Sequence, residues 1–369
     1  MKLRYKILIG VVAMFGVAFA ALAITLSYDS PCPPAPPLDE GVQAIRAVIN
    51  RCYGVPEGIA LEKIAKPTPG EDRVLIKVHA SSVNPAEWYG ISGRPQLIRL
   101  ESGIGAPEGD GRAGYDVAGV VEAVGAKVTL FKPGDEVFGG VHGALGEYVV
   151  AREQGALVVK PAELSFEEAA AMPIAAITAL QGLRDQGGIK AGQKVLINGA
   201  SGGVGTYAVQ IAKAFGAEVT GVCSTRNAEM VRSLGADHVI DYTKDDFTEG
   251  KERYDMILDN VGSQGFFAME NVMKPGGVIV VVGGSKKGAL LGPIKRIAWA
   301  RIAGPFIDPQ VKFFLARVNK ADLELLAGLA RDGKLKSVID KRYPLEQTAA
   351  ALEYLGAGHA RGKVVVTVN

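Results

Sequence analysis

The stretch Lys194-Val-Leu-Ile-Asn-Gly-Ala-Ser-Gly-Gly-Val-Gly-Thr206 decides the fold of this chain. The apolar run at 195–197 predicts a buried strand, and the apolar spacing in 207–215 predicts a helix, so a glycine-rich turn joins a strand to a helix. The turn matches the dinucleotide fingerprint with alanine replacing its first glycine, and it would hold a pyrophosphate at the helix N-terminus. The predicted cofactor-binding residues of this turn are Ala200, Ser201, Gly202, Gly203, Val204 and Gly205.

Two domains of different kinds are predicted around this unit. Downstream, apolar strands alternate with helical segments, which is typical of the α/β class with a doubly wound parallel sheet. Those strands are expected at 218–223, 238–242, 256–259 and 277–282. Upstream, short alternating runs and turns predict a β-rich domain with strands at 43–49, 73–80 and 116–124. Ser165 and Glu168 have capping-box spacing and predict the helix that leads into the nucleotide domain.

Composition narrows the function class. The chain has 369 residues, is 48% hydrophobic and 22% charged, and carries a net charge of +2, so it can bury two cores and shows no sign of a nucleic-acid partner. Cys32, Cys52 and Cys223 are odd in number, widely spaced and without a CxxC pair. We therefore predict neither a disulfide framework nor a zinc site from them.

The N-terminus has a pattern of its own. Three cations, Lys2, Arg4 and Lys6, precede the uncharged run 7–28, which as a helix is long enough to cross a hydrocarbon core of about 30 Å. We predict a retained transmembrane helix over 1–28, with a cleaved signal peptide or a soluble core helix as alternatives. The cations favour a cytoplasmic N-terminus, whereas a cytosolic cofactor pool favours the opposite orientation, so the side of the membrane stays open.

The predicted domain boundaries follow from these patterns. A proline-rich linker separates the anchor from a folded enzyme that should start near Val42, and a final strand at 362–368 returns to the first domain. The predicted segments are the anchor 1–28, the linker 29–41, the first domain 42–165, the nucleotide domain 166–337 and the return 338–369.

Five motifs in order give the chain a family resemblance from about residue 42 to the end. They are Val83-Asn-Pro-Ala-Glu-Trp88, Gly114-Tyr-Asp-Val-Ala-Gly-Val-Val121, Phe131-Lys-Pro-Gly-Asp-Glu-Val-Phe-Gly139, Asn198-Gly-Ala-Ser-Gly-Gly-Val-Gly205 and Arg361-Gly-Lys-Val-Val365. The chain resembles the zinc-independent quinone oxidoreductases of the medium-chain dehydrogenase/reductase superfamily. The resemblance implies a GroES-like substrate domain interrupted by a Rossmann domain, with the active site in the cleft between them. The N-terminal anchor lies outside the family pattern.

No metal site is predicted. Where zinc-dependent relatives carry a ligand cysteine this chain has Asn84, and their Gly-His-Glu triplet is Gly114-Tyr115-Asp116 here. The four-cysteine lobe is missing, and the histidines are scattered: His79, His142, His238 and His359. Without a Lewis acid, a hydride is better delivered to a substrate that is already electrophilic, such as a quinone or conjugated enone.

NADPH is the predicted cofactor. After the second strand of the nucleotide domain the chain has Ser224 and Arg226 and no carboxylate, a combination that suits a 2′-phosphate. Alternatively, Arg226 is a solvated residue at the start of a helix. Tyr242 resembles a family position beside the adenosine. Asn260 follows the fourth strand, and the pair Gly283 and Gly284 would leave room for the nicotinamide.

Asn84 and Tyr89 are the predicted catalytic residues, because their segment lines the nicotinamide pocket in the resembled family. Asn84 could donate to the developing oxyanion, and Tyr89 could donate its hydroxyl or stack on a flat ring. A turn role for Asn84 and a packing role for Tyr89 are the structural alternatives. No dedicated proton donor is apparent, and water could protonate the product.

Three functions are therefore compared. The first is an NADPH-dependent reductase of quinones or enones, with 2-alkenal or enoyl reduction as its close rival. The second is a membrane-tethered NADPH-binding protein with little turnover, and the third is a structural partner in a membrane complex. The run 290–302 interleaves apolar residues and cations, which suits a second membrane contact, a cleft lid or a subunit interface of a possible homodimer.

Overall fold

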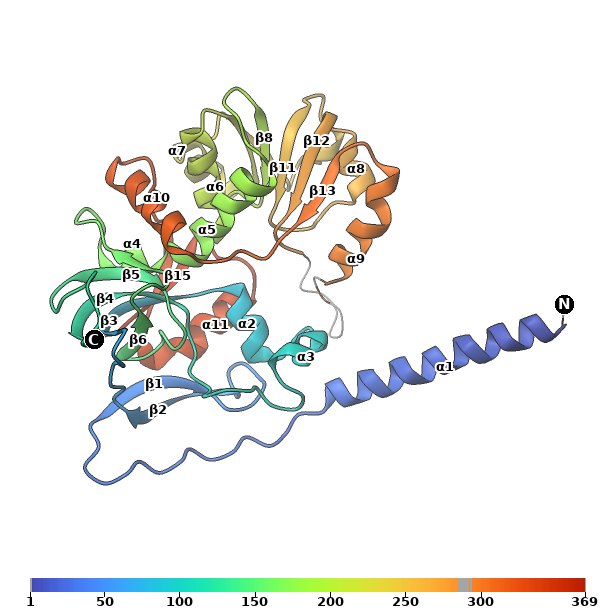
Figure 1. Cartoon of the computed structure of the whole chain (residues 1–369). Helices are drawn as coiled ribbons and strands as arrows, with labels where there is room; N and C mark the ends of the chain where they lie inside the picture. Colours follow the sequence, from blue (N-terminus) through green and yellow to red (C-terminus); the bar gives the residue numbers. More distant parts are fainter. Residues whose placement is uncertain (1, 285–291, 293, 369) are drawn as a thin grey trace.

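The computed structural model describes residues 2–284, 292 and 294–368, and within them all side chains except those of 2–12, 15, 294 and 297. Two sheet-based domains form the body of the molecule, and α1 (Lys2–Ser27) leads away from it (Figure 1). The α/β class with a GroES-like and a Rossmann-like sheet is confirmed.

The first domain is built on a mainly antiparallel sheet in the order β14-β15-β3-β4-β5-β7, with β6 also paired to β3. Its strands are β3 (Arg73–Val83), β4 (Asp116–Val124), β5 (Glu136–Gly140), β6 (Tyr148–Arg152), β7 (Leu157–Val159), β14 (Ile339–Pro344) and β15 (Lys363–Thr367). A separate hairpin is made of β1 (Ala44–Asn50) and β2 (Ile59–Ala65). Because β15 pairs antiparallel with β3, the C-terminal strand returns to this domain and brings Lys363 close to Asn84.

The second domain is a parallel sheet in the order β10-β9-β8-β11-β12-β13, so the strand order reverses at β8. Its strands are β8 (Lys194–Asn198), β9 (Glu218–Cys223), β10 (His238–Asp241), β11 (Tyr254–Asp259), β12 (Met273–Val281) and β13 (Gln310–Phe313). Helices flank it, as predicted for a doubly wound fold (Figure 1). They are α5 (Pro173–Gln181), α6 (Gly203–Ala214), α7 (Ala228–Ser233), α8 (Phe266–Glu270), α9 (Ile294–Ala303) and α10 (Lys320–Arg331).

Further short helices pack on or near the first domain. The predicted capping box starts α4: the Glu168 N–H donates to Ser165 Oγ at 3.2 Å, and the Ser165 N–H donates to the Glu168 carboxylate at 2.9 Å. The helices of this group are α2 (Pro85–Ser92), α3 (Arg99–Ser102), α4 (Phe166–Ala170) and α11 (Thr348–Gly356). Single turns are η1 (Gln96–Ile98), η2 (Gly182–Gln186), η3 (Thr225–Asn227), η4 (Phe247–Glu249), η5 (Gly304–Phe306) and η6 (Leu345–Gln347).

One buried cluster joins the two domains. Ala80 and Ala118 of the first sheet pack in the same apolar cluster as Ile177 of α5 and Val195 and Ile197 of β8. Close packing of this kind transmits strain and resists deformation. The two sheets are therefore held together by a shared core.

The predicted transmembrane helix is not supported by the fold. In the part of the chain whose side chains are described, no helix is both long and apolar enough to cross a membrane. Much of the predicted span 7–28 falls on residues 7–12 and 15, whose side chains lie outside the described set.

The segment after α1 is fixed to the first domain. Leu26 is fully buried, Arg99 Nη1 donates to the Leu26 carbonyl at 2.9 Å, and the Ser30 N–H donates to the Gly105 carbonyl at 2.8 Å. Folded contacts thus begin at Leu26, earlier than the expected start near Val42, because Arg99 binds carbonyls that the helix C-terminus leaves unpaired.

The prediction that the cysteines form no disulfide is wrong for two of them. Cys32 and Cys52 are paired, with their Cα atoms 5.0 Å apart, and Cys223 is free and buried. The linker runs beneath the β1–β2 hairpin and returns through β1, so the two positions meet despite a separation of 20 residues (Figure 1).

Candidate functional site

At the carboxyl edge of the parallel sheet the strand order reverses between β8 and β11, and open α/β sheets bind ligands in the crevice outside such a switch point. Asn198 Nδ2 donates to Asp259 Oδ1 at 2.8 Å, and Asn260 Nδ2 donates to the Asn198 carbonyl at 2.9 Å. Asn260 Oδ1 is buried and has no hydrogen-bond partner among the described atoms. A buried acceptor without a donor is costly, so this atom favours a ligand that can donate to it.

The glycine turn uses a residue that the sequence fingerprint missed. Gly199 has φ +78°, whereas Ala200, which stands at the first glycine position, is fully buried. A Cβ on Gly205 would lie 2.1 Å from the Gly199 carbonyl oxygen, so α6 can pack this closely only on glycine. Because α6 starts at Gly203, its unpaired N–H groups open onto the crevice end of the turn and suit a pyrophosphate.

The predicted adenosine end lies at the same edge. Ser224 and Arg226 follow β9, and the exposed Tyr242 follows β10. Asp241, which no sequence pattern singles out, accepts a hydrogen bond from Thr225 Oγ1 beside Arg226. That hydrogen bond is the largest cause that lowers the pKa of Asp241 to about 2, so a full negative charge lies in contact with the neighbour of Arg226.

The ends of β11 and β12 approach each other closely. A Cβ on Gly283 would lie 2.1 Å from the Asn260 carbonyl oxygen, and one on Gly262 would lie 3.0 Å from Gly284 Cα. Glycines are therefore needed where the two strand ends pack together, and the Arg296 side chain covers Gly262. The fold brings the predicted cofactor residues to one edge of one sheet: Ala200, Ser201, Gly202, Gly203, Val204, Gly205, Ser224, Arg226, Tyr242, Asn260, Gly283 and Gly284.

The run 290–302, predicted as a membrane contact, lid or subunit interface, lies partly outside the described residues. Its described part is α9, which carries the half-exposed Trp299. Arg296 of α9 forms an ion pair with Asp259 and stacks over Phe266, with its guanidinium carbon 4.6 Å from the ring centroid. These contacts attach α9 to the crevice end of β11.

On the substrate side, Asn84 belongs to a buried polar network. It is only 1% exposed; its Nδ2 donates to Asp116 Oδ2 at 2.8 Å, and its Oδ1 accepts from Lys363 Nζ at 2.5 Å. The same Asp116 oxygen accepts from Ser82 Oγ at 2.7 Å and lies 3.4 Å from Lys363 Nζ. Both ends of the Asn84 amide are therefore already engaged.

Glu87 completes this network. One carboxylate oxygen, Oε2, accepts from the Asn84 N–H at 2.7 Å, while Oε1 is buried with no hydrogen-bond partner among the described atoms. Burial, followed by repulsion from Asp116, raises the pKa of Glu87 from 4.5 to about 8. At neutral pH this carboxyl group therefore keeps its proton.

Tyr89 stays free of that network. It is half-buried on α2, its ring meets Trp88 edge to face at a centroid distance of 5.5 Å, and burial raises its pKa. The second domain approaches the same region, because a Cβ on Gly292 would lie 3.1 Å from Pro95 Cβ, shortly after α2.

Comparison with known proteins agrees with this geometry. The model of the alcohol dehydrogenase GroES-like domain matches residues 70–162, and that of a zinc-binding dehydrogenase matches 234–366. A 2-methylene-furan-3-one reductase of Solanum lycopersicum is 36% identical over 85% of this chain and 76% of its own. A chloroplastic NADPH-dependent alkenal/one oxidoreductase of Arabidopsis thaliana is 32% identical over 94% and 83%. The quinone oxidoreductase of Coxiella burnetii superposes with a TM-score of 0.76 at 31% identity over 89% and 100%.

The chain belongs to the quinone oxidoreductase-like medium-chain dehydrogenases/reductases. Members of this superfamily bind a nicotinamide cofactor, and the crevice of this medium-chain dehydrogenase/reductase fits one. Its glycine turn, its helix N-terminus and the unpaired Asn260 acceptor are the features that suit a dinucleotide.

Metal binding is a separate question in this medium-chain dehydrogenase/reductase. Within the described residues, no three His, Cys, Asp or Glu side chains come together in a way that could hold an ion. The ring of His79 stacks on Phe166 at 4.4 Å, His142 Nε2 lies 3.2 Å from Asp110, and His238 lies 3.3 Å from Glu218. The carbonyl of the fourth, His359, accepts weakly from Arg226 at 3.3 Å. The metal-free site stays a prediction.

Lys363 stands within the motif Arg361-Gly-Lys-Val-Val365, which by itself predicts no role for it. A buried lysine in an apolar strand is rare unless it is paired, and this was the signal that could have identified it. Its partners could not be named from the sequence, because Asn84 is 279 residues away and Asp116 is 247 residues away.

Proposed function

We propose that this chain is an NADPH-dependent reductase of quinones or conjugated enones that works without zinc. The observation that carries the proposal is the position of Lys363. Its ammonium group bonds Asn84 and lies 3.4 Å from Asp116, the two positions that correspond to metal-ligand segments in zinc-dependent relatives. A divalent cation there would meet a fixed positive charge at close range.

The chain's own residues would bind and orient the reactants. A nicotinamide cofactor would supply the hydride. The N–H groups at the start of α6 would hold its pyrophosphate, with Ser224 and Arg226 at the 2′-phosphate and Tyr242 beside the adenosine. Asn260 Oδ1 offers an acceptor, and Gly283 and Gly284, which carry no side chains, would leave room for the nicotinamide.

We assign substrate contact first to Tyr89. Its hydroxyl can donate to a developing oxyanion, and its ring can stack on a flat acceptor. Asn84 could donate to substrate only by giving up its bond to Asp116 or another of its present contacts. Its proposed role therefore includes positioning Lys363 and Asp116 behind the reacting groups.

Reduction of 2-alkenals or enoyl substrates is the second candidate, favoured by the alkenal/one and furanone reductases among the relatives. A membrane-tethered NADPH-binding protein with little turnover is the third candidate.

We also propose that α1 attaches the enzyme to a membrane, motivated by its uncharged run. Carbonate extraction that releases chain with an intact N-terminus would contradict this attachment.

One assay separates the candidates. Purified full chain, treated with chelator, is given NADPH with a 1,4-quinone, a conjugated enone or a 2-alkenal, and separately NADP⁺ with a primary alcohol. We expect NADPH oxidation with one or more of the electrophiles and no oxidation of the alcohol. Alcohol oxidation without any reduction of the electrophiles would overturn the proposal, and tight NADPH binding without turnover would favour the tethered binding protein.

A further inference from the structure

A covalent link joins the N-terminal segment to the first domain. Cys32 lies between α1 and β1, and Cys52 lies just after β1. Their Cα atoms are 5.0 Å apart, within the 4.4–6.8 Å range usual for disulfides, so no backbone movement is needed to bond them. The third cysteine, Cys223, is 1% exposed in the core of the second domain and cannot compete for either partner.

Noncovalent contacts hold the same segment in place independently of the sulfur atoms. The Asp29 carboxylate pairs with Arg99 Nη1 at 2.8 Å, and Arg99 is only 3% exposed. Tyr53, next to Cys52, lies under the Arg99 guanidinium at 4.3 Å and donates its hydroxyl to the Gly103 carbonyl at 2.6 Å. The cysteines therefore meet because both chain segments bind one buried arginine.

We infer that the Cys32–Cys52 bond forms as the protein matures and that the folded domain consequently lies in an oxidising compartment rather than in the reducing cytosol. Structural disulfides form and persist where thiols are oxidised, and they are rare where glutathione and thioredoxin keep thiols reduced. Forming this bond removes two protons and two electrons from the two thiols. A disulfide-bearing oxidant protein accepts them by thiol–disulfide exchange and leaves as a dithiol.

The N-terminal charges agree with this placement. Lys2, Arg4 and Lys6 precede the uncharged run, and positive charges before such a run favour a cytoplasmic N-terminus with the downstream chain exported. A retained anchor and a cleaved signal peptide both give that result. The sequence alone left the orientation open, and the disulfide favours one side.

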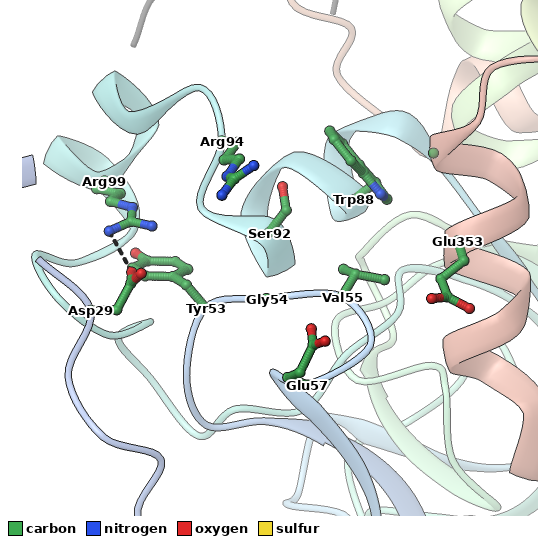
Figure 2. Close-up of a pocket in the computed structure, with 11 residues that line it drawn as sticks. Asp29, Tyr53, Gly54, Val55, Glu57, Trp88, Ser92, Arg94, Arg99 and Glu353 are labelled. Carbon is green, nitrogen blue, oxygen red and sulfur yellow. Dashed lines mark ion pairs between the residues drawn. The ribbon is translucent and has the colours of Figure 1, made fainter. Parts of the chain in front are cut away.

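The chain segments that the disulfide joins also line a pocket. A cavity of about 380 Å³ lies on the side of α2 that carries Trp88, and Asp29 and Tyr53 form its wall opposite Arg94 (Figure 2). The disulfide adds a covalent link to the ion pair and the ring contact with Arg99 that hold Asp29 and Tyr53 in that wall. This feature is separate from the sheet edge proposed to hold the cofactor.

Thiol trapping on the full chain tests the bond. Cells expressing the chain are quenched in acid and alkylated with a first maleimide under denaturing conditions, then reduced and labelled with a heavier one, and peptides are read by mass spectrometry. We expect the heavier label on Cys32 and Cys52 and the first label on Cys223. In the matched Cys32→Ser variant, Cys52 should take the first label. First label on both Cys32 and Cys52 of the unaltered chain would overturn the inference.

A pair of reporters tests the compartment. Alkaline phosphatase, which needs its own disulfides, and a cytosolic fluorescent protein are fused in turn to the C-terminus of the full chain. Active phosphatase and a dark fluorescent fusion are expected. The opposite result would overturn the compartment assignment even if the bond is found. Neither readout depends on NADPH turnover, so failure here is distinguishable from failure of the proposed reaction.

Discussion

Two regions of this enzyme treat polar groups in opposite ways. The cofactor edge is the carboxyl edge of the parallel sheet, and the substrate wall is the buried network of Asn84, Asp116, Lys363 and Glu87. At the sheet edge, Asn260 Oδ1 has no donor among the residues that the structure describes, and the exposed Arg226 makes a long contact to the His359 carbonyl. In the wall, Asn84, Asp116 and Lys363 satisfy one another inside the protein. The cofactor edge therefore offers polar groups to a ligand, whereas the polar groups of the substrate wall already bind one another. The difference predicts that edge variants change affinity and wall variants change stability.

The largest effect should come from Lys363. Replacing it with alanine leaves Asp116 buried without its cation, and breaking a buried pair in this way costs about 3–5 kcal/mol. Urea unfolding followed by tryptophan fluorescence measures the loss. The matched control is Lys334→Ala, whose exposed pair with Asp332 is worth at most about 1 kcal/mol.

A double variant sharpens that test. Lys363→Met combined with Asp116→Asn removes both charges, so it should lose less stability than Lys363→Ala alone. If Lys363→Ala costs no more than the surface control, the wall is not an internal charge network, and the contrast with the cofactor edge fails.

Glu87 should make the stability of the folded protein depend on pH. Its pKa is about 8 folded against 4.5 as a free side chain, so between these values the folded state holds a proton that the unfolded state has released. The contribution of Glu87 to stability should therefore fall by about 5 kcal/mol as pH rises from about 4.5 to 8, and it should be constant outside that window.

The matched variant is Glu87→Gln, which keeps the size and a backbone-capping oxygen without titrating. Denaturation at pH 5 and pH 8 should show a smaller difference for this variant than for the unaltered chain. The exposed Glu163→Gln variant is the control and should keep the original difference. An unchanged pH dependence in Glu87→Gln would mean that the carboxyl group is ionised in the wall.

These two regions also differ in what the sequence could predict. The strand, turn and helix around 194–215 follow from local spacing, and the parallel sheet follows from the alternation of strands and helices downstream. Parallel strands present their carboxyl ends at one edge, so the order of the elements along the chain is enough to place the cofactor residues together.

The wall could not be predicted in that way. Its polar contacts join β3, β4 and β15, whose pairing is set by long-range register, and Asn84 therefore looked free to meet substrate. The same limit hid the disulfide, because only the return of the linker beneath the hairpin brings Cys32 to Cys52. Local patterns pointed to Gly202 and Gly205 and did not point to Gly199, whose positive φ is a property of the folded turn.

At the cofactor edge, Arg226 and Asp241 should act in opposite directions. Arg226→Ala should weaken NADPH binding relative to NADH by about 1.5–3 kcal/mol, the usual worth of a hydrogen bond to a charged group. Asp241→Asn should strengthen NADPH binding, because it removes a negative charge close to the proposed phosphate position. Dissociation constants from fluorescence titration measure both changes. Arg253→Ala, at the opposite edge before β11, is the control, and an unchanged NADPH preference in Arg226→Ala would show that Arg226 is a solvated residue.

The smallest effect on activity or affinity is expected at Tyr89, which lies on α2 shortly after Asn84. Tyr89→Phe keeps the ring and deletes the hydroxyl. A hydrogen bond from this half-buried hydroxyl to a developing oxyanion should be worth about 1.5 kcal/mol, the low end for a charged acceptor, so kcat should fall roughly 10-fold with little change in stability. Asn84→Ala should instead lower stability as well as kcat, because it removes partners of both Asp116 and Lys363. Steady-state kinetics with a 1,4-quinone, combined with urea unfolding, separates the roles of the two residues. Tyr148→Phe on β6 is the control, because it removes a tyrosine hydroxyl outside the proposed site. Equal kcat in Tyr89→Phe and the unaltered chain would leave the ring with a stacking role only, and a stability loss confined to Tyr89→Phe would reverse the assignment of the two residues.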